Sequence, residues 1–178
     1  MPRIPYVAAD IAEPAALVAA IRARRGGELL HLDRMLLHSP PFAAGWNDFL
    51  GKVRGELALA PRLMELAICV VAVLNGADYE FSHHEPLYAA AGAGREQLEA
   101  LRGLGNAAAD LSAFEPVEQR VIALTRELTR DAEITEPTFN AARQCLADDR
   151  QVVELVGVVA AYNMVSRLLV AFDIEPER

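Results

Sequence analysis

Residues 61–92 read PRLMELAICVVAVLNGADYEFSHHEPLYAAAG, and this stretch indicates the kind of fold more clearly than any other part of the chain. It begins with proline, which is favoured at the first position of a helix, and continues almost wholly apolar with Glu65 as its one carboxylate. Asn75–Gly76 interrupts the apolar run, and Asp78 is a candidate N-cap for a second helix that begins at Tyr79. The pattern therefore predicts two helices joined by a short turn.

The remaining sequence predicts further helices. No segment alternates apolar and polar residues over the length of a strand, and no hairpin signal separates β-branched runs. A capping-box pattern at Ser112–Glu115 predicts a helix that starts near Ala113. We expect an all-α, single-domain helical bundle, with flanking helices at about residues 13–25, 28–38, 39–57, 95–104, 113–130, 135–146 and 150–172.

The last of these helices is apolar enough to resemble a membrane span. Its apolar part, residues 152–171, is interrupted by Glu154, Asn163, Ser166 and Arg167, which a bilayer segment would rarely carry. We therefore expect a buried helix or a helix at a subunit interface.

Composition restricts the classes of function. The 178 residues are 53% hydrophobic and carry a net charge of -8, so no basic surface remains for nucleic acid or an anionic membrane. Cys69 and Cys145 are the two cysteines, at no metal-finger or CxxC spacing, which excludes a disulfide framework. The first residues contain no apolar run of signal-peptide length, so a cytoplasmic location is expected.

Titratable side chains gather where the two central helices meet. Glu80 and His84 are four residues apart and so share one helix face. A charged Glu80 in the first helical turn favours the imidazolium form of His84, and such a pair can transfer protons near neutral pH. If the turn folds the helices together, Glu65 can join them. The alternative is a surface Glu–His pair of little energetic value.

Two neighbours of this pair are further candidates. His83 points about 100° away from His84 around the helix, so it either lines the same pocket or is exposed or paired at a subunit contact. Tyr79 is either a packing aromatic or a ligand contact.

Metal and thiol chemistry are the alternatives to acid/base chemistry. Glu28–His31 and Glu80–His83 are both Glu-x-x-His, the spacing of di-iron bundles, but the first lies in a short leucine-rich segment, and we expect neither a metal nor another cofactor. Cys69 is one turn after Glu65 but is embedded in aliphatic residues, where thiols are usually inert.

The segment from Glu65 to Gly92 resembles the carboxymuconolactone decarboxylase family, which shares its fold with alkylhydroperoxidase D-type proteins. The resemblance is specific over about residues 40–105, and residues 161–171 are similar to the family's C-terminal helix. It implies a homo-oligomer, a trimer or hexamer, with sites near subunit contacts.

The peroxidase branch of this family carries Cys-x-x-Cys-x-x-x-His after a glutamate. When the motif is aligned on His84, its two cysteine positions fall at Ala77 and Glu80. Glu65 matches the glutamate, which belongs to the proton relay of that branch. The resemblance therefore implies the decarboxylase-like branch, with His84 as proton donor, Glu80 orienting it and Glu65 completing the relay.

The implied reaction is loss of carbon dioxide from a small carboxylated lactone or a related metabolite. Tyr79, His83 and Asn163 are the candidate substrate contacts, although a satisfied core amide is the alternative for Asn163. Two further hypotheses stay open: an alkylhydroperoxidase/peroxiredoxin-type redox protein of the peroxidase branch, for which Cys69 is the one nearby thiol, and a non-catalytic oligomeric binding protein that has kept the fold.

Overall fold

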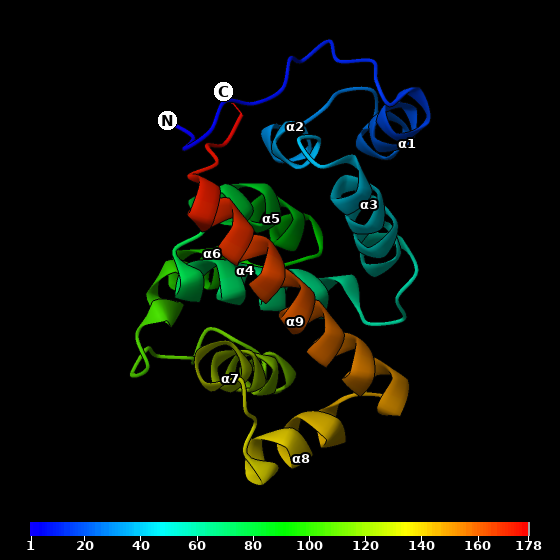
Figure 1. Ribbon diagram of the computed structural model, residues 1–178. Coiled ribbons are helices and arrows are strands. Elements are labelled where there is room, and N and C mark those ends of the chain that lie inside the picture. Colours follow the sequence, from blue (N-terminus) through cyan, green and yellow to red (C-terminus); the bar gives the residue numbers. More distant parts are fainter. Residues whose placement is uncertain (178) are drawn as a thin grey trace. The chain divides into compact units, whose positions relative to one another are not determined.

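The computed structural model describes residues 1–177, and the secondary structure within them is entirely helical (Figure 1). The prediction of an all-α fold is confirmed. The elements are α1 (Ala15–Arg25), α2 (His31–Leu36), α3 (Pro40–Gly55), α4 (Pro61–Asn75), α5 (Asp78–Ala90), α6 (Arg95–Leu101), the 3₁₀ helix η1 (Arg102–Gly105), α7 (Pro116–Asp131), α8 (Glu136–Cys145) and α9 (Asp149–Phe172).

The helices form two compact units. The first contains Met1–Leu57 and the C-terminal residues from Ala171, and the second contains Ala58–Val170. The expectation that all 178 residues act as one domain stays a prediction.

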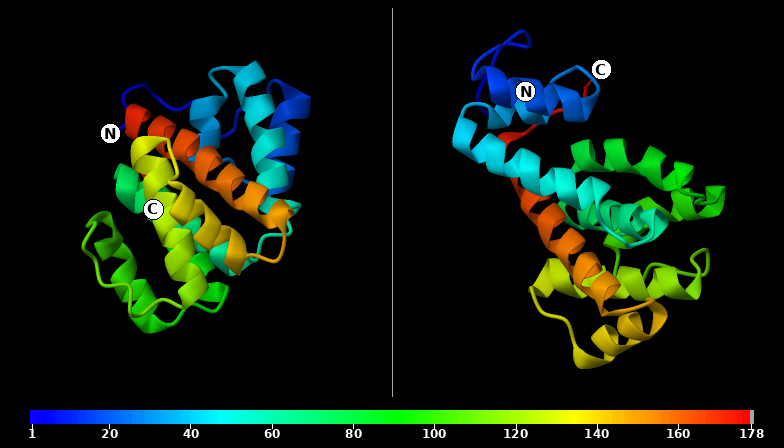
Figure 2. Two further views of the ribbon diagram at one scale, coloured as in Figure 1. Left: turned by 90° about the horizontal axis from the view of Figure 1, so that it is seen from below. Right: turned by 90° about the vertical axis from the view of Figure 1, so that its right-hand side faces the viewer.

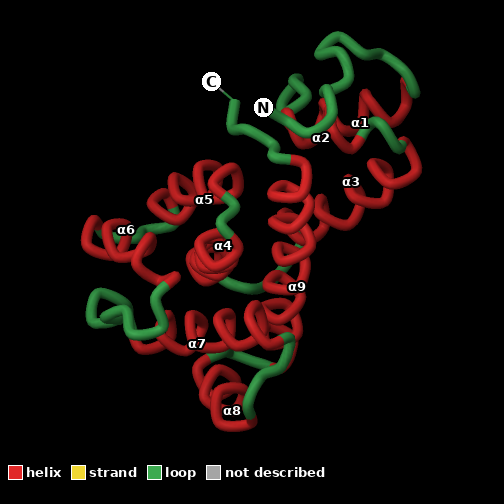
Figure 3. Tube along the Cα trace, turned by 60° about the vertical axis from the view of Figure 1, so that its left-hand side comes forward, coloured by secondary structure: helices red, strands yellow, loops and turns green. Residues whose placement is uncertain are grey.

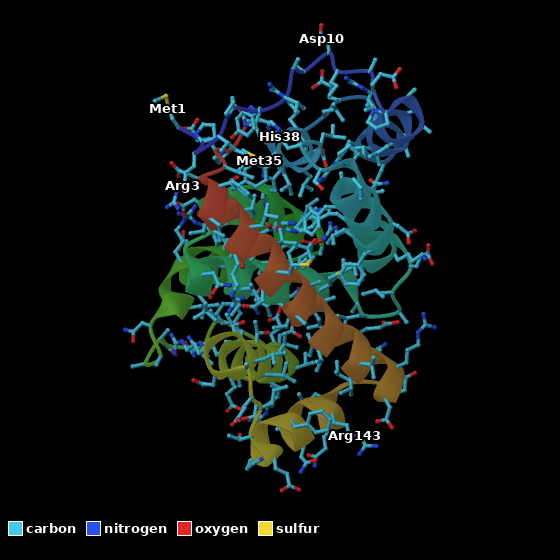
Figure 4. All side chains as sticks on the ribbon, viewed as in Figure 1. Met1, Arg3, Asp10, Met35, His38 and Arg143 are labelled. Atoms are coloured by element: carbon cyan, nitrogen blue, oxygen red, sulfur yellow. The ribbon has the colours of Figure 1, made fainter. Side chains whose placement is uncertain are left out.

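The first unit is built on α1, α2 and α3, with α3 packed on both of the others (Figure 2). Buried Asp33 links α2 to α1, because it accepts hydrogen bonds from the guanidinium of Arg25 at 2.9 and 3.1 Å. The N-terminal segment, which carries Met1 and Arg3, runs beside the C-terminal residues (Figure 4). The backbone N–H of Arg3 donates to the carbonyl of Phe172 at 2.9 Å.

The second unit is organised around α4. Every residue from Leu63 to Ala72 is buried, as expected for a helix that is apolar on all sides and therefore surrounded by other helices. Figure 3 shows α4 nearly end-on between α5 and α7, both of which pack against it. Helix α4 is the core of this unit, so any polar side chain on it is held away from water.

A glycine turn reverses the chain between α4 and α5. Gly76 has a φ of 65°, in the left-handed region that glycine adopts readily, and Ala77 N–H donates to the carbonyl of Ala72 at 2.9 Å. The expectation that Asp78 caps α5 is wrong: Asp78 is the first helical residue, the N-cap is Ala77, and no side chain caps this end. Asp78 instead lies in the first turn, where its charge is favourable to the helix dipole.

The start of α7 also differs from the expectation. The box predicted at Ser112–Glu115 does not form, because Ser112 hydrogen-bonds to the carboxylate of Asp110 at 2.8 and 2.9 Å. The helix begins at Pro116, and the carboxylate of Glu118 accepts a 2.9 Å hydrogen bond from Glu115 N–H. Proline at the first helical position needs no N–H partner, so the start moves to it.

Helix α9 is the one described helix that is long and apolar enough to cross a membrane, and half of its most apolar window is buried against the chain itself. Its polar side chains have partners within the second unit: Glu154 accepts hydrogen bonds from the N–H groups of Ala58 and Leu59 at 2.8 and 2.7 Å. These are the properties of a core helix in a helical domain.

Candidate active site

The three predicted catalytic residues meet between α4 and α5. Glu65 lies in the second turn of α4, and Glu80 and His84 lie on one face of α5. All three are buried, with exposed fractions of 4%, 4% and 7% for Glu65, Glu80 and His84. The surface Glu–His alternative therefore does not apply, because burial makes these hydrogen bonds and charges matter energetically.

His84 is held between the two carboxylates through both of its ring nitrogens. Nδ1 lies 2.6 Å from Oε2 of Glu65, and Nε2 lies 2.9 Å from Oε1 of Glu80. A neutral imidazole has a single N–H and could donate to one carboxylate only, whereas an imidazolium donates to both. The geometry therefore suits a charged ring that shares its two protons with two acceptors.

The electrostatic surroundings of His84 also favour the charged form of the ring. Burial alone lowers the pKa of His84, but the hydrogen bonds and charges of Glu65 and Glu80 outweigh it and raise the pKa above its ordinary value. The ring is thus poised to hold a proton near neutral pH and to release it when a carboxylate contact changes. This is the property that general acid/base chemistry requires.

An aromatic side chain from α9 closes one side of this group. The ring of Tyr162, which is buried, meets the ring of His84 edge-on, with centroids 5.1 Å apart and planes at 83°. Sequence reasoning missed Tyr162 and chose its neighbour Asn163. Tyr162 is the one aromatic residue in the apolar stretch 152–171, and this was the signal that could have identified it.

Asn163 has the contacts of a satisfied core amide. Its side-chain NH₂ donates to Oγ1 of Thr129 and to the carbonyl of Val159, both at 2.9 Å, and its amide oxygen accepts from Asn75 at 3.1 Å. These bonds connect α4, α7 and α9. A substrate contact at Asn163 stays a prediction.

Tyr79 and His83 form a separate pair on α5. Their rings stack with centroids 4.4 Å apart, and Nδ1 of His83 lies 2.8 Å from the backbone carbonyl oxygen of Tyr79. Tyr79 is buried and His83 is half-buried. His83 thus faces a different direction from His84, as its position on the helix predicts, and its contact with a substrate stays a prediction.

The thiol of Cys69 lies one turn after Glu65 and is fully buried. Burial is the main cause that raises the pKa of this thiol, and the nearby carboxylates of Glu65, Glu85 and Glu80 raise it further. A neutral buried thiol is a poor nucleophile and a poor metal ligand. Cys145, at the end of α8, is exposed.

The side chains do not converge in the manner of a metal centre. In residues 1–177, no group of three histidine, cysteine, aspartate or glutamate side chains could hold a metal ion. The carboxylate of Glu80 contacts His84, and the δ-nitrogen of His83 faces a backbone carbonyl, so the Glu80–His83 spacing does not act as a ligand pair. These residues do not fit the di-iron arrangement.

Comparison with known proteins identifies the family of this chain. The family model described as the carboxymuconolactone decarboxylase family matches residues 40–127, which include α4, α5 and the three candidate catalytic residues. The chain belongs to this family. No protein of curated function matches the sequence significantly.

Solved structures share the fold of this carboxymuconolactone decarboxylase family member. An uncharacterized peroxidase-related protein from Silicibacter sp. TM1040 superposes with a TM-score of 0.79 at 17% identity, over 99% of this chain and 94% of the other. A second uncharacterized peroxidase-related protein, an alkylhydroperoxidase AhpD core from Ralstonia eutropha JMP134, gives 0.78 at 16% identity, over 99% and 92%. A variant of the debrominase Bmp8 in complex with 2,3,4-tribromopyrrole gives 0.74 at 13% identity, over 99% and 94%.

Proposed function

We propose that this family member is a cofactor-independent acid/base lyase that removes carbon dioxide from a small carboxylated lactone or a related metabolite. The observation that supports it is the buried hydrogen bonding of His84 through both ring nitrogens, to Glu65 and to Glu80. Membership of the carboxymuconolactone decarboxylase family gives the reaction class its support.

This decarboxylation requires one proton to be delivered to the substrate carbon that loses its carboxylate. The bond between the substrate carbon and its carboxylate breaks, carbon dioxide leaves, and the electron pair stays on the carbon, delocalised into the lactone. A proton from the site then forms the new C–H bond, so that a carboxylate and a proton become carbon dioxide and a C–H group. A positioned acid with a pKa near the working pH accelerates such a step roughly 100- to 10,000-fold.

We assign the outgoing proton to the Nε2 side of His84. The Nε2–Glu80 hydrogen bond, at 2.9 Å, is longer than the Nδ1–Glu65 bond, at 2.6 Å. Both carboxylates are equally buried, each 4% exposed, so the assignment rests on the longer hydrogen bond. His84 then donates the proton to the carbon from Nε2, Glu80 orients the ring, and Glu65 completes the relay at Nδ1.

The redox alternative has little support. Both cysteine positions of the peroxidase motif are occupied by other residues, Ala77 and Glu80. The remaining nearby thiol, Cys69, is fully buried, and burial raises its pKa, which suppresses the thiolate that such chemistry needs.

The assembly and the substrate contacts are part of the same proposal. The family resemblance supports a homo-oligomer, a trimer or hexamer, and we propose that the protein acts in the cytoplasm. Tyr79, His83 and Asn163 are the proposed substrate contacts. Light scattering coupled to size-exclusion chromatography measures the oligomer, and a monomer at micromolar concentration would contradict this part.

The test of the reaction uses a panel of small carboxylated lactones with the purified protein. Turnover is followed by release of carbon dioxide and, in D₂O, by incorporation of one deuterium at the former carboxylate carbon. We expect His84→Ala and Glu80→Gln to abolish both signals. His38→Ala is the control, because the imidazole of His38 contacts the carbonyl of Pro5 in the first unit at 2.7 Å.

Each outcome has a distinct meaning. Turnover that is unchanged in His84→Ala contradicts the proposal. Peroxide consumption that disappears in Cys69→Ala would favour the redox protein instead. Binding of a carboxylated lactone by calorimetry without turnover of any panel member would favour the non-catalytic binding protein.

A further inference from the structure

A further buried carboxylate, Glu118 on α7, lies in the same unit as the candidate site. Its exposed fraction is 1%, and its two oxygens accept four hydrogen bonds. The donors are Arg62 Nε at 2.8 Å, Tyr88 Oη at 2.8 Å, Gln97 Nε2 at 2.6 Å and Glu115 N–H at 2.9 Å. All four acceptor positions of this carboxylate are therefore used.

Glu118 remains charged within this cluster. Burial raises the pKa of Glu118, but the Arg62 guanidinium, the Glu115 N–H and the Tyr88 hydroxyl together lower it below its ordinary value. Arg62 supplies the balancing charge and also donates to the carbonyl of Gly92 at 2.6 Å and to Gln97 Oε1 at 3.0 Å. A charged, fully bonded pair of this kind has one well-defined geometry.

Two of its partners lie one helical turn from the candidate catalytic residues. Arg62 precedes Glu65 by three residues on α4, and Tyr88 follows His84 by four residues on α5. Residues three or four apart share a helix face. The α4–α5 pair is therefore joined twice on adjoining turns, once by Glu65 and His84 and once through Glu118.

We propose that Glu118 is a positioning residue, which holds Arg62 of α4 and Tyr88 of α5 at a fixed spacing and thereby sets the hydrogen bond between Glu65 and His84. The alternative is that Glu118 contributes to stability alone. Its consequence for catalysis rests on the proposed lyase function, whereas the coupling to His84 does not.

The neighbours of His84 and of Glu118 show how a substitution at Glu118 affects His84. His84 faces Glu65 of α4, Glu80 of its own helix and the ring of Tyr162 of α9. The four hydrogen bonds to Glu118 come from other residues, namely Arg62, Tyr88, Gln97 and Glu115. A change at Glu118 or Tyr88 thus reaches the imidazole through the spacing of the helices.

The experiment observes His84 directly. The four histidines are labelled with ¹⁵N, and the imidazole resonances of His84 are identified by their loss in His84→Gln. The test variants are Tyr88→Phe, which removes only a hydroxyl, and Glu118→Gln, which keeps the shape. We expect both to weaken the Nδ1 hydrogen bond, shifting the Nδ1 resonance and lowering the pH at which His84 titrates.

A matched control separates positioning from stability. Half-buried Glu127, also on α7, accepts hydrogen bonds from Thr135 N–H at 2.7 Å and Thr138 Oγ1 at 2.6 Å, so Glu127→Gln loosens α7 from α8. We expect this variant to lower the unfolding midpoint as Tyr88→Phe does, while the His84 resonances stay at their wild-type positions.

Activity gives the second measurement. With any accepted substrate, we expect Tyr88→Phe to reduce kcat by up to roughly 100-fold with little change in KM, as a misplaced catalytic group does. Unchanged His84 resonances and titration in both Tyr88→Phe and Glu118→Gln would overturn the positioning role, whatever the activity. Failure of the proposed function appears elsewhere, as full turnover in His84→Ala.

Discussion

Oε2 of Glu65 on α4 lies 2.6 Å from Nδ1 of His84 on α5, and this buried contact joins two helices across a reversal of the chain. Glu80 completes the arrangement from the other side of the ring at 2.9 Å. A histidine that donates hydrogen bonds to two carboxylates has a protonation state that depends on both contacts. This dependence can be measured without knowing the substrate.

Loss of one carboxylate is expected to destabilise the protein strongly. Glu65→Gln leaves the buried imidazolium with one charged partner, and breaking a buried ion pair in this way costs about 3–5 kcal/mol of unfolding free energy. Urea unfolding of Glu65→Gln, His84→Gln and the double variant is expected to show coupling of about 0.5–3 kcal/mol. Strictly additive effects would contradict the contact.

An exposed ion pair supplies the comparison for this prediction. Glu99 pairs with Arg95 at 2.7 Å on the surface of α6. Surface pairs contribute about 0–1 kcal/mol, so Glu99→Gln is expected to change the unfolding free energy little. A similar loss in Glu99→Gln and Glu65→Gln would mean that burial has no effect on the Glu65–His84 pair.

Stability is expected to fall on the alkaline side because of His84. The folded protein raises the pKa of His84 above 6.5, so the stabilisation is complete below that pH and is lost as the pH rises through the folded pKa. The free energy of unfolding is measured by urea titration from pH 5 to 9. The alkaline decline is expected to flatten in His84→Gln, and an equal decline in both proteins would contradict the assignment.

Stability is expected to fall on the acid side because of Glu118. The folded protein lowers the pKa of Glu118 below 4.5, so its contribution is present above that pH and is lost as the pH falls through the folded pKa. The acid unfolding midpoint, followed by circular dichroism, is the measurement. Glu118→Gln, already less stable at neutral pH, is expected to lose less stability than the wild type between neutral and acid pH.

The two cysteines are expected to differ in reactivity. Cys69 is fully buried with a raised pKa, whereas Cys145 is exposed. A disulfide reagent at pH 8 is expected to modify one thiol per chain in the folded protein and both in denaturant. Rapid modification of Cys69 in the native protein would show that the α4 core opens readily.

The turn between α4 and α5 is expected to require glycine. Gly76 has a φ of 65°, so Gly76→Ala is strained even though nothing lies within 4 Å of the added methyl group. We expect a loss of about 1 kcal/mol. Gly157→Ala, in the interior of α9 with open space around it, is the control and is expected to be neutral or stabilising by about 0.5–1 kcal/mol. Equal effects at both positions would show that backbone conformation at Gly76 is unimportant.

Several features of the site follow from local sequence alone. The spacing of Glu80 and His84 places them on one helix face wherever that helix lies, and the apolar run around Glu65 indicates a buried helix. The break at Gly76 predicts the reversal between the helices. Local rules were less successful at helix starts: Asp78 does not cap α5, and the start of α7 is at Pro116, because proline and backbone geometry outweighed the side-chain capping pattern.

The amino-acid sequence by itself determined the helices and their apolar faces and supplied the candidate catalytic residues, because helical periodicity is a local property. Only the tertiary structure decided which distant side chains meet. Tyr162 reaches the ring of His84, and Glu118 holds Arg62 from 56 positions away in the chain. Such contacts depend on how the helices pack against each other, and no local spacing encodes that packing.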